Sequence, residues 1–229
     1  MTHFKAILFD LDGTLIDTTD LILHCFNHSW QTVCDRIHSR ETLIATMGIP
    51  LKDAMRRLLA TLDDLCLERI GEARTEDLIE QLLTEYRACN RANHDRLARP
   101  FNGVGDALSR LCRQGRKIGV VTSKSREFAL RGLRLCSLFE VLDVIVCMED
   151  TERHKPHPAP LHLALEQLHL APHQAAYVGD SRHDMKAGRA AGVQTVAALW
   201  GPVPKSELEQ EQPDFAAERP ADLLEIFGS

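Results

Sequence analysis

The stretch ILFDLDGT at residues 7–14 decides the fold that we expect for this chain. Residues 5–9 are mostly apolar and are bounded by turn residues, which is typical of a short buried strand. Two aspartates, Asp10 and Asp12, come directly after this strand, and Gly13 then lets the chain turn. We therefore predict a strand that ends in two closely spaced carboxylates.

Helical patterns fill the next part of the sequence. Apolar residues recur at helical spacing over residues 18–33, and further helices are predicted at residues 52–59 and 75–89. Gly48-Ile49-Pro50 interrupts these patterns, and the PFNG segment at residues 100–103 is typical of a linker. We find no convincing strand in this part of the chain, and we interpret it as a helical unit.

Strands and helices alternate from residue 104 onward. The expected helices are residues 104–114, 127–135, 158–169 and 184–191, the expected strands are residues 117–121, 141–147, 175–178 and 195–199, and residues 201–213 are predicted to be an exposed loop. This alternation implies an α/β fold with a Rossmann-like parallel sheet and helices on both faces. Ligands bind beyond the carboxyl ends of the strands in such sheets, and Asp10, Thr122 and Asp180 each follow a predicted strand.

Composition and charge limit the function classes. A chain of 229 residues suits one core domain with a modest insertion, and 44% hydrophobic residues can form a substantial core. The net charge of −6 and the lack of a basic stripe argue against nucleic acid as a partner. The sequence has no signal peptide and no apolar run of the roughly 20 residues that cross a bilayer, so we expect a cytoplasmic protein without a membrane partner.

The seven cysteines are expected to be free thiols. Their number is odd, their spacing is wide, and no Cys-x-x-Cys pair occurs, which argues against a disulfide framework and against a zinc site. They are Cys25, Cys34, Cys66, Cys89, Cys112, Cys136 and Cys147.

Four aspartates suggest a metal site. Asp10 and Asp12 follow the first strand, and Asp180 and Asp184 follow a later one. Carboxylates held close together are costly unless a cation neutralises them, and hard oxygen ligands favour Mg²⁺ over zinc. Each aspartate alone could simply cap the next helix, but four of them after predicted neighbouring strands favour Mg²⁺ binding.

Three further residues could hold a phosphate. Thr122 and Ser123 offer hydroxyl and backbone N–H groups at a strand end, and Lys155 lies in a loop that prolines stiffen. A fixed ammonium could offset the charge of the aspartates and of a phosphate. Taken singly, Thr122 could be an ordinary helix cap and Lys155 a solvated loop lysine.

The order of these features resembles the haloacid dehalogenase superfamily over essentially the whole chain. Its four motifs correspond here to residues 10–14 (DLDGT), Thr122, Lys155 before a proline, and residues 179–184 (GDSRHD). The resemblance implies that the helical stretch is a small cap inserted after the first motif. We therefore expect a core domain of residues 1–16 and 91–229 and a cap domain of residues 17–90.

The resemblance also implies a role for each motif residue. Asp10 would attack phosphorus and form an aspartyl-phosphate, and Asp12 would protonate the leaving oxygen and then deprotonate the attacking water. Mg²⁺ would be held by the Asp10 carboxylate, the Asp12 backbone carbonyl, Asp180 and Asp184. The phosphoryl group would be bound by Gly13, Thr122, Ser123 and Lys155.

The second aspartate distinguishes between branches of the superfamily. The dehalogenating and phosphonate-cleaving branches lack an aspartate at the position of Asp12, so phosphoester chemistry is favoured. The sequence is most similar to the phosphoglycolate phosphatase group and its inorganic pyrophosphatase relatives. A pyrophosphatase, a β-phosphoglucomutase-like isomerase and a non-catalytic regulatory protein remain as alternatives. We expect a small phosphate ester as substrate and a monomer or homodimer.

Specificity is expected to come from the cap. The loop Gly48-Ile49-Pro50 is predicted to face the site, and nearby Lys52, Arg56 and Arg57 could meet a carboxylate or a second phosphate of the substrate. The alternative is that these three cations are solvated helix charges. Arg126 and His154 are weaker candidates.

Overall fold

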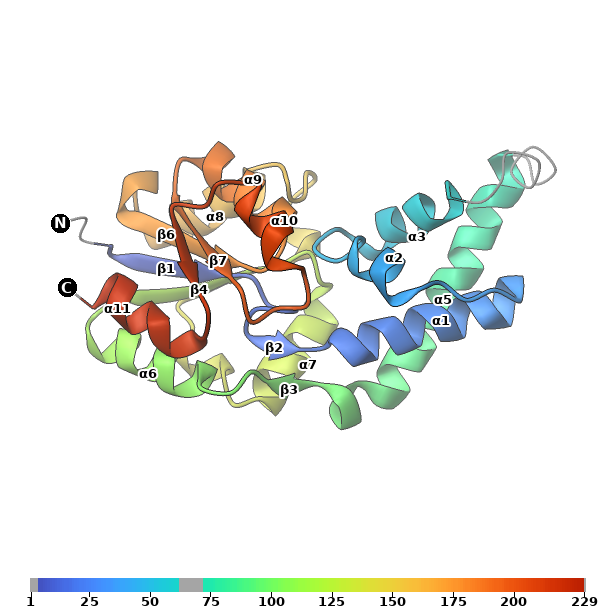
Figure 1. Ribbon diagram of the computed structural model, residues 1–229, viewed down its shortest axis with the longest axis horizontal. Helices are drawn as coiled ribbons and strands as arrows, with labels where there is room; N and C mark the ends of the chain where they lie inside the picture. The colour runs from blue at the N-terminus through green and yellow to red at the C-terminus, as the bar shows by residue number, and fades with distance from the viewer. Residues whose placement is uncertain (1–3, 62–71, 229) are drawn as a thin grey trace.

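A six-stranded parallel sheet forms the centre of the larger part of the molecule (Figure 1). The computed structural model describes residues 4–61 and 72–228. The strand order is β5-β4-β1-β6-β7-β8, so the first strand lies between β4 and β6. The strands are β1 (Ala6–Phe9), β4 (Lys117–Val121), β5 (Val144–Val146), β6 (Ala175–Gly179), β7 (Gln194–Ala198) and β8 (Phe215–Ala217).

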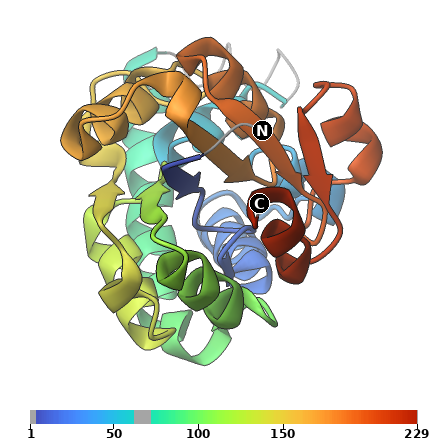
Figure 2. The ribbon, with the colours of Figure 1, turned by 90° about the vertical axis from the view of Figure 1, so that its left-hand side faces the viewer.

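Helices cover both faces of this sheet, as Figure 2 shows from the end of the core opposite the helical insertion. Ile7 and Phe9 of β1 pack against one set of helices, and Ala6 and Leu8 pack against the other, because successive strand residues point to opposite faces. The first set is α6 (Val104–Arg113), α7 (Arg126–Leu135) and α11 (Leu223–Phe227), and the second is α8 (Ala159–Leu168) and α9 (Arg182–Ala191). The predicted α/β fold class is confirmed.

The helical insertion has an apolar core of its own. Its helices are α1 (Thr19–Cys34), α2 (Arg40–Ile44), α3 (Leu51–Leu59) and α5 (Glu72–Leu97), and α1 and α5 pack along each other. Trp30, Met55 and Leu82 are fully buried in this apolar core of the insertion. The insertion therefore forms a separately packed cap beside the core, as Figure 1 shows.

The chain enters and leaves the cap through a short antiparallel ribbon. Ile16 of β2 (Ile16–Asp17) pairs with Pro100 of β3 (Arg99–Pro100). The boundary predicted between residues 90 and 91 lies inside α5, whose last turns reach the core. There Arg91 pairs with Glu127 of α7 at 3.0 Å. The domain boundaries stay a prediction.

Three local predictions need correction. The strand predicted at residues 141–147 is shorter, because a 3-10 turn precedes it and Asp143 accepts a hydrogen bond from the Ile118 backbone before β5 begins. A further strand, β8, follows β7 and was not among the predicted strands. The loop predicted at residues 201–213 contains α10 (Lys205–Glu209), which buried Leu208 anchors to the core.

Short 3-10 helices also occur within the described part of the chain. They are η1 (Phe139–Val141), η2 (Met148–Asp150), η3 (Pro172–Gln174) and η4 (Pro220–Asp222).

Two further expectations concern cysteines and membranes. The six cysteines within the described part of the chain are free thiols, whereas Cys66 lies outside the described residues. Among the helices of residues 4–61 and 72–228, none combines the length and the apolar composition that crossing a bilayer requires.

Leu111 of α6 is fully buried in the core and provides a test of this packing. We expect Leu111→Ala to lower the free energy of unfolding by roughly 2–5 kcal/mol, because the substitution removes the buried isopropyl group with its contacts and leaves a cavity. Urea denaturation measures this change. Leu135→Ala, at a side chain that is 43% exposed, is the control and should change stability by less than about 0.5 kcal/mol.

Candidate active site

Three neighbouring strands bring the predicted site residues to one edge of the sheet. Asp10 follows β1, Thr122 follows β4 and Asp180 follows β6, and β1 pairs in parallel with both neighbours. The Asp10 backbone N–H continues the ladder by donating to the Val178 carbonyl at 2.9 Å. Parallel pairing therefore places residues that are far apart in the sequence beside one another.

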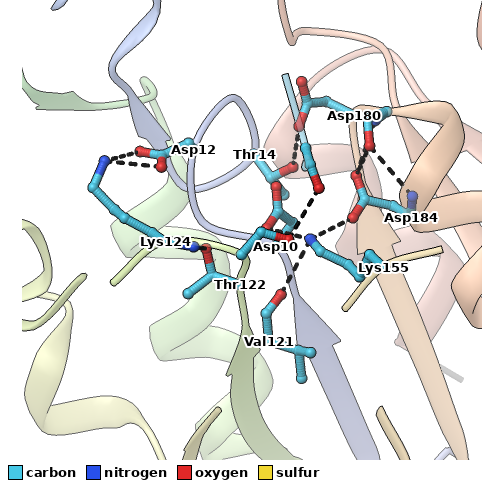
Figure 3. Close-up of polar contacts among 12 residues, drawn as sticks. Asp10, Asp12, Thr14, Val121, Thr122, Lys124, Lys155, Asp180 and Asp184 are labelled. Atoms are coloured by element: carbon cyan, nitrogen blue, oxygen red, sulfur yellow. Dashed lines mark hydrogen bonds and ion pairs between the residues drawn. The ribbon is translucent and has the colours of Figure 1, made fainter. Parts of the chain in front are cut away.

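Three buried carboxylates meet at this edge (Figure 3). One oxygen from each of Asp10, Asp180 and Asp184 lies within 4.8 Å of the others. Asp184 reaches the cluster from the first turn of α9, where Ser181 caps the helix and donates its hydroxyl to the Asp184 carboxylate at 2.5 Å. Hard oxygen donors at this spacing are the kind of ligand set that Mg²⁺ prefers.

Lys155 lies among these carboxylates. Its ammonium donates to Asp10 and to Asp184, each at 2.7 Å, and to the Tyr177 hydroxyl at 3.0 Å. Burial opposes the charged form, but the charges of Asp10 and Asp184 prevail and raise the pKa of Lys155. Lys155 therefore stays charged, although it is only 2% exposed.

One ammonium does not neutralise three carboxylates. Burial raises the pKa of Asp10 to about 7, and the charge of Asp184 adds to this shift while Lys155 opposes it. The pKa of Asp180 is likewise raised well above its usual range, by burial and then by the charges of Asp10 and Asp184. Ionisation of all three carboxylates beside one ammonium would leave excess negative charge, which a divalent cation would offset.

The Asp12 carboxylate points away from this cluster, as Figure 3 shows. Its two oxygens accept hydrogen bonds from the Lys124 ammonium at 2.7 and 2.8 Å, and the Thr18 hydroxyl donates to it at 2.6 Å. Only its backbone carbonyl is therefore a candidate metal ligand, as the sequence resemblance implied. The carboxylate itself is bound by core and cap side chains rather than by the cluster.

Glycine is required in the turn after Asp12. Gly13 has a φ of 86°, and a Cβ at this position would collide with the Asp180 carboxylate. The next residue, Thr14, donates its hydroxyl to Asp180 at 2.9 Å. This turn therefore brings the backbone of the first motif against the fourth motif.

Thr122 and Ser123 form different contacts. The Thr122 hydroxyl accepts a hydrogen bond from the Lys124 backbone N–H at 3.1 Å, which is a local turn contact. The Ser123 hydroxyl donates to the backbone carbonyl of Gly48 at 3.0 Å and so links the core to the cap loop. Both residues line a cavity between the core and the cap.

A cavity of about 420 Å³ lies between core and cap. Asp10, Asp12 and Lys124 line it on the core side, and the Gly48-Ile49-Pro50 loop lines it on the cap side, as predicted. Gly48 has a φ of 85°, and a Cβ there would lie 2.6 Å from the Ser181 hydroxyl oxygen, so the loop approaches the core closely.

Most of the cations predicted for this cavity are already paired. Lys52 lines it, but its ammonium binds Glu80 at 2.8 Å and Glu76 at 3.2 Å. Arg56 pairs with Glu76 at 2.9 Å, and Arg126 pairs with Asp150. Arg57 lines a second cavity of about 190 Å³ beside His183, and His154 lines the first.

Several residues in or beside this cavity were not predicted. Lys124 and Thr18 hold the Asp12 carboxylate, and the signal that could have identified Lys124 is its position two residues after Thr122. Tyr86, Arg87 and Asn90 line the cavity from α5. They lie within a long helix and belong to no motif, so the sequence offered no signal for them.

The family model described as haloacid dehalogenase-like hydrolase matches residues 7–198. The chain belongs to the haloacid dehalogenase-like hydrolase family. The predicted superfamily is thus confirmed, and the chain is a hydrolase of this family.

Relatives of this haloacid dehalogenase-like hydrolase extend over its whole length. Pyrophosphatase PpaX of Bacillus cereus (strain B4264) is 37% identical over 227 residues, which cover 99% of this chain and 98% of the relative. The structure of a predicted phosphoglycolate phosphatase from Haemophilus somnus 129PT has a TM-score of 0.85 at 27% identity, with 99% of each chain covered. A haloacid dehalogenase-like family hydrolase from Streptococcus pneumoniae has a TM-score of 0.83 at 28% identity, covering 99% of this chain and 100% of that one.

The carboxylate cluster provides a test that needs no substrate. We expect Mg²⁺ to raise the thermal midpoint above that in EDTA, because the cation relieves the repulsion among Asp10, Asp180 and Asp184. At a free Mg²⁺ concentration of about 100 times Kd, the stabilisation would be about 2.7 kcal/mol. Asp180→Asn should reduce this response, whereas exposed Asp106→Asn should retain it. An equal Mg²⁺ response in Asp180→Asn would contradict the assignment.

Proposed function

We propose that this hydrolase is a Mg²⁺-dependent phosphatase that cleaves a small phosphate monoester through an aspartyl-phosphate on Asp10. The observation that carries the proposal is the buried cluster of Asp10, Asp180, Asp184 and Lys155 at the carboxyl edge of the sheet. A nucleophilic carboxylate beside a fixed ammonium and further oxygen ligands suits phosphoryl transfer, which depends mainly on positioning and charge stabilisation.

Asp10 is the proposed nucleophile. It is 3% exposed, it lies at the end of the central strand, and it borders the cavity. Lys155 binds one of its oxygens at 2.7 Å, which restrains the carboxylate and leaves the other oxygen available to attack phosphorus. Attack would form the acyl phosphate and release the alcohol oxygen of the substrate.

Asp12 is the proposed acid and base. Its carboxylate lies two residues from the nucleophile, borders the same cavity and takes no part in the three-carboxylate cluster. It would protonate the leaving oxygen and then take a proton from the water that hydrolyses the aspartyl-phosphate. Thr18 and Lys124 restrain its position through the contacts described above.

The donor set fits Mg²⁺. Asp10, Asp180, Asp184 and the backbone carbonyl of Asp12 would hold the ion, which would favour the ionised form of Asp10, whose pKa burial raises. When bound, Mg²⁺ would neutralise charge on the phosphoryl oxygens. Gly13, Thr122, Ser123 and Lys155 are proposed to bind the phosphoryl group from the protein side.

A pyrophosphatase is the principal alternative. The Bacillus cereus relative, which is 37% identical, is named a pyrophosphatase, and this favours it. The core residues named above serve equally for an ester and for pyrophosphate, and also for a β-phosphoglucomutase-like isomerase. The alternatives differ in the products: a phosphatase releases phosphate irreversibly, whereas a mutase interconverts sugar phosphates.

The nucleophile provides the first functional test. We expect Asp10→Asn to lower phosphate release from a panel of small phosphoesters to below about one thousandth of the wild-type rate, since the amide is a poor nucleophile. Circular dichroism in EDTA should show an unchanged fold. Asp106→Asn is the control and should retain full activity. If wild type shows no Mg²⁺-dependent turnover on any phosphoester, the enzyme proposal is wrong.

Asp12→Asn tests the proton transfer. We expect a loss of about 10²- to 10⁴-fold in kcat on alkyl phosphates, whose leaving oxygen needs a proton, and a smaller loss on p-nitrophenyl phosphate, whose leaving group is a stable anion. Thr18→Val removes only one hydrogen bond to the same carboxylate and should show no such dependence on the leaving group. Equal losses by Asp12→Asn on both substrates would argue against the acid role.

A further inference from the structure

Asn90 of α5 has a buried polar atom without a partner in the cavity between core and cap. The side chain is 2% exposed, and its Oδ1 accepts no hydrogen bond from any residue of the described chain. Other such orphan atoms occur within the described ranges, but among the residues that carry them Asn90 is the one that lines this cavity. A buried carbonyl oxygen without a donor destabilises a fold, so its presence at a ligand cavity points to a ligand that supplies the donor.

Arg87 lies three residues earlier on the same side of the helix. It lines the cavity and is exposed there, and the structure shows no ion pair or hydrogen bond from its guanidinium to the described residues. The other cationic side chains of the cavity differ in this respect. Lys52 binds two glutamates and Lys124 binds Asp12. The charge of Arg87 is therefore available to an anionic group of a ligand.

The rest of the cap-side wall is largely apolar. Phe26, Met47, Ile49 and Leu51 belong to it, and Phe128 and Met148 extend this apolar lining from the core. The volume of about 420 Å³ lies within the range of sites for small organic molecules. A second inorganic phosphate would use neither the apolar wall nor most of this volume.

These features favour one class of substrate over the others. We propose that Asn90 and Arg87 form a subsite for the leaving group, and that the substrate is an organic phosphate monoester whose alcohol part carries a hydroxyl and an acidic group. The hydroxyl donates to the Asn90 Oδ1, and the acidic group binds the Arg87 guanidinium. The inference rests on the proposed phosphatase function and deepens it, because it disfavours pyrophosphate as the best substrate.

Matched substrates separate the two contacts. 3-Phosphoglycerate carries both groups, 3-phosphonooxypropionate lacks the hydroxyl, and glycerol 3-phosphate lacks the carboxylate. We expect Asn90→Leu to lower kcat/KM for 3-phosphoglycerate about tenfold while changing that for 3-phosphonooxypropionate little. We expect Arg87→Gln to lower kcat/KM for 3-phosphoglycerate about tenfold or more, with little change for glycerol 3-phosphate.

Two variants on the same helix serve as controls. Asn93→Leu and Arg74→Gln change the same residue types at positions that do not line the cavity, and they should leave the discrimination among these substrates unchanged. Asn90→Leu also removes the side-chain hydrogen bond to Tyr86, so the comparison among substrates, rather than the unfolding midpoint, decides the role of Asn90. A purely structural role for Asn90 would reduce turnover of all substrates together.

The outcomes distinguish this inference from the proposed function. If p-nitrophenyl phosphate and all the other phosphoesters yield no phosphate, the proposed function fails and the inference fails with it. If p-nitrophenyl phosphate is hydrolysed but Asn90→Leu and Arg87→Gln leave the ratios of kcat/KM among the three matched substrates unchanged, the subsite alone is wrong. A kcat/KM for pyrophosphate above that of every organic ester would also overturn the inference.

Discussion

The contact of one buried ammonium with two buried carboxylates is the constraint on which the rest of the structure depends. Lys155 binds Asp10 and Asp184 at 2.7 Å, and all three side chains are nearly inaccessible to water. Charges buried in this way are tolerated only with partners in good geometry. The Tyr177 hydroxyl bonds both to Lys155 and to Asp184, so the sheet itself holds the group in place.

That contact explains the tight packing around the first motif. Asp180 adds a third carboxylate to the cluster, and the backbone at Gly13 packs directly against it. Gly13 permits this approach because it has no side chain, and Thr14 fixes Asp180 by a hydrogen bond. The core thus supplies rigid charge at one edge of the sheet, independent of the cap.

The cap contributes a different kind of surface. Its lining is largely apolar, and among its polar groups are a carboxamide oxygen without a partner and the Arg87 guanidinium. The link from Ser123 to the Gly48 carbonyl joins the two parts next to the second motif. In the proposed function, charge stabilisation would come from the core and leaving-group contacts from α5, so the two roles would be separated in space.

The sequence by itself determined the sheet, its helices and the grouping of the motif aspartates. Strand and helix periodicity is local, and parallel strands necessarily bring their carboxyl ends together, so Asp10, Thr122 and Asp180 could be grouped without coordinates. The short β8 and α10 escaped prediction, because a few residues in a polar stretch carry little periodic signal.

Only the tertiary structure decided which cap residues face the site. Lys52 and Arg56 looked suitable from the sequence, yet α3 packs beside α5 so that Glu76 and Glu80 neutralise both. Asn90 and Arg87 looked like ordinary helix residues. Whether a helical side chain meets a carboxylate, a cavity or solvent depends on how two helices pack, and that is set by contacts between residues distant in the chain rather than by local pattern.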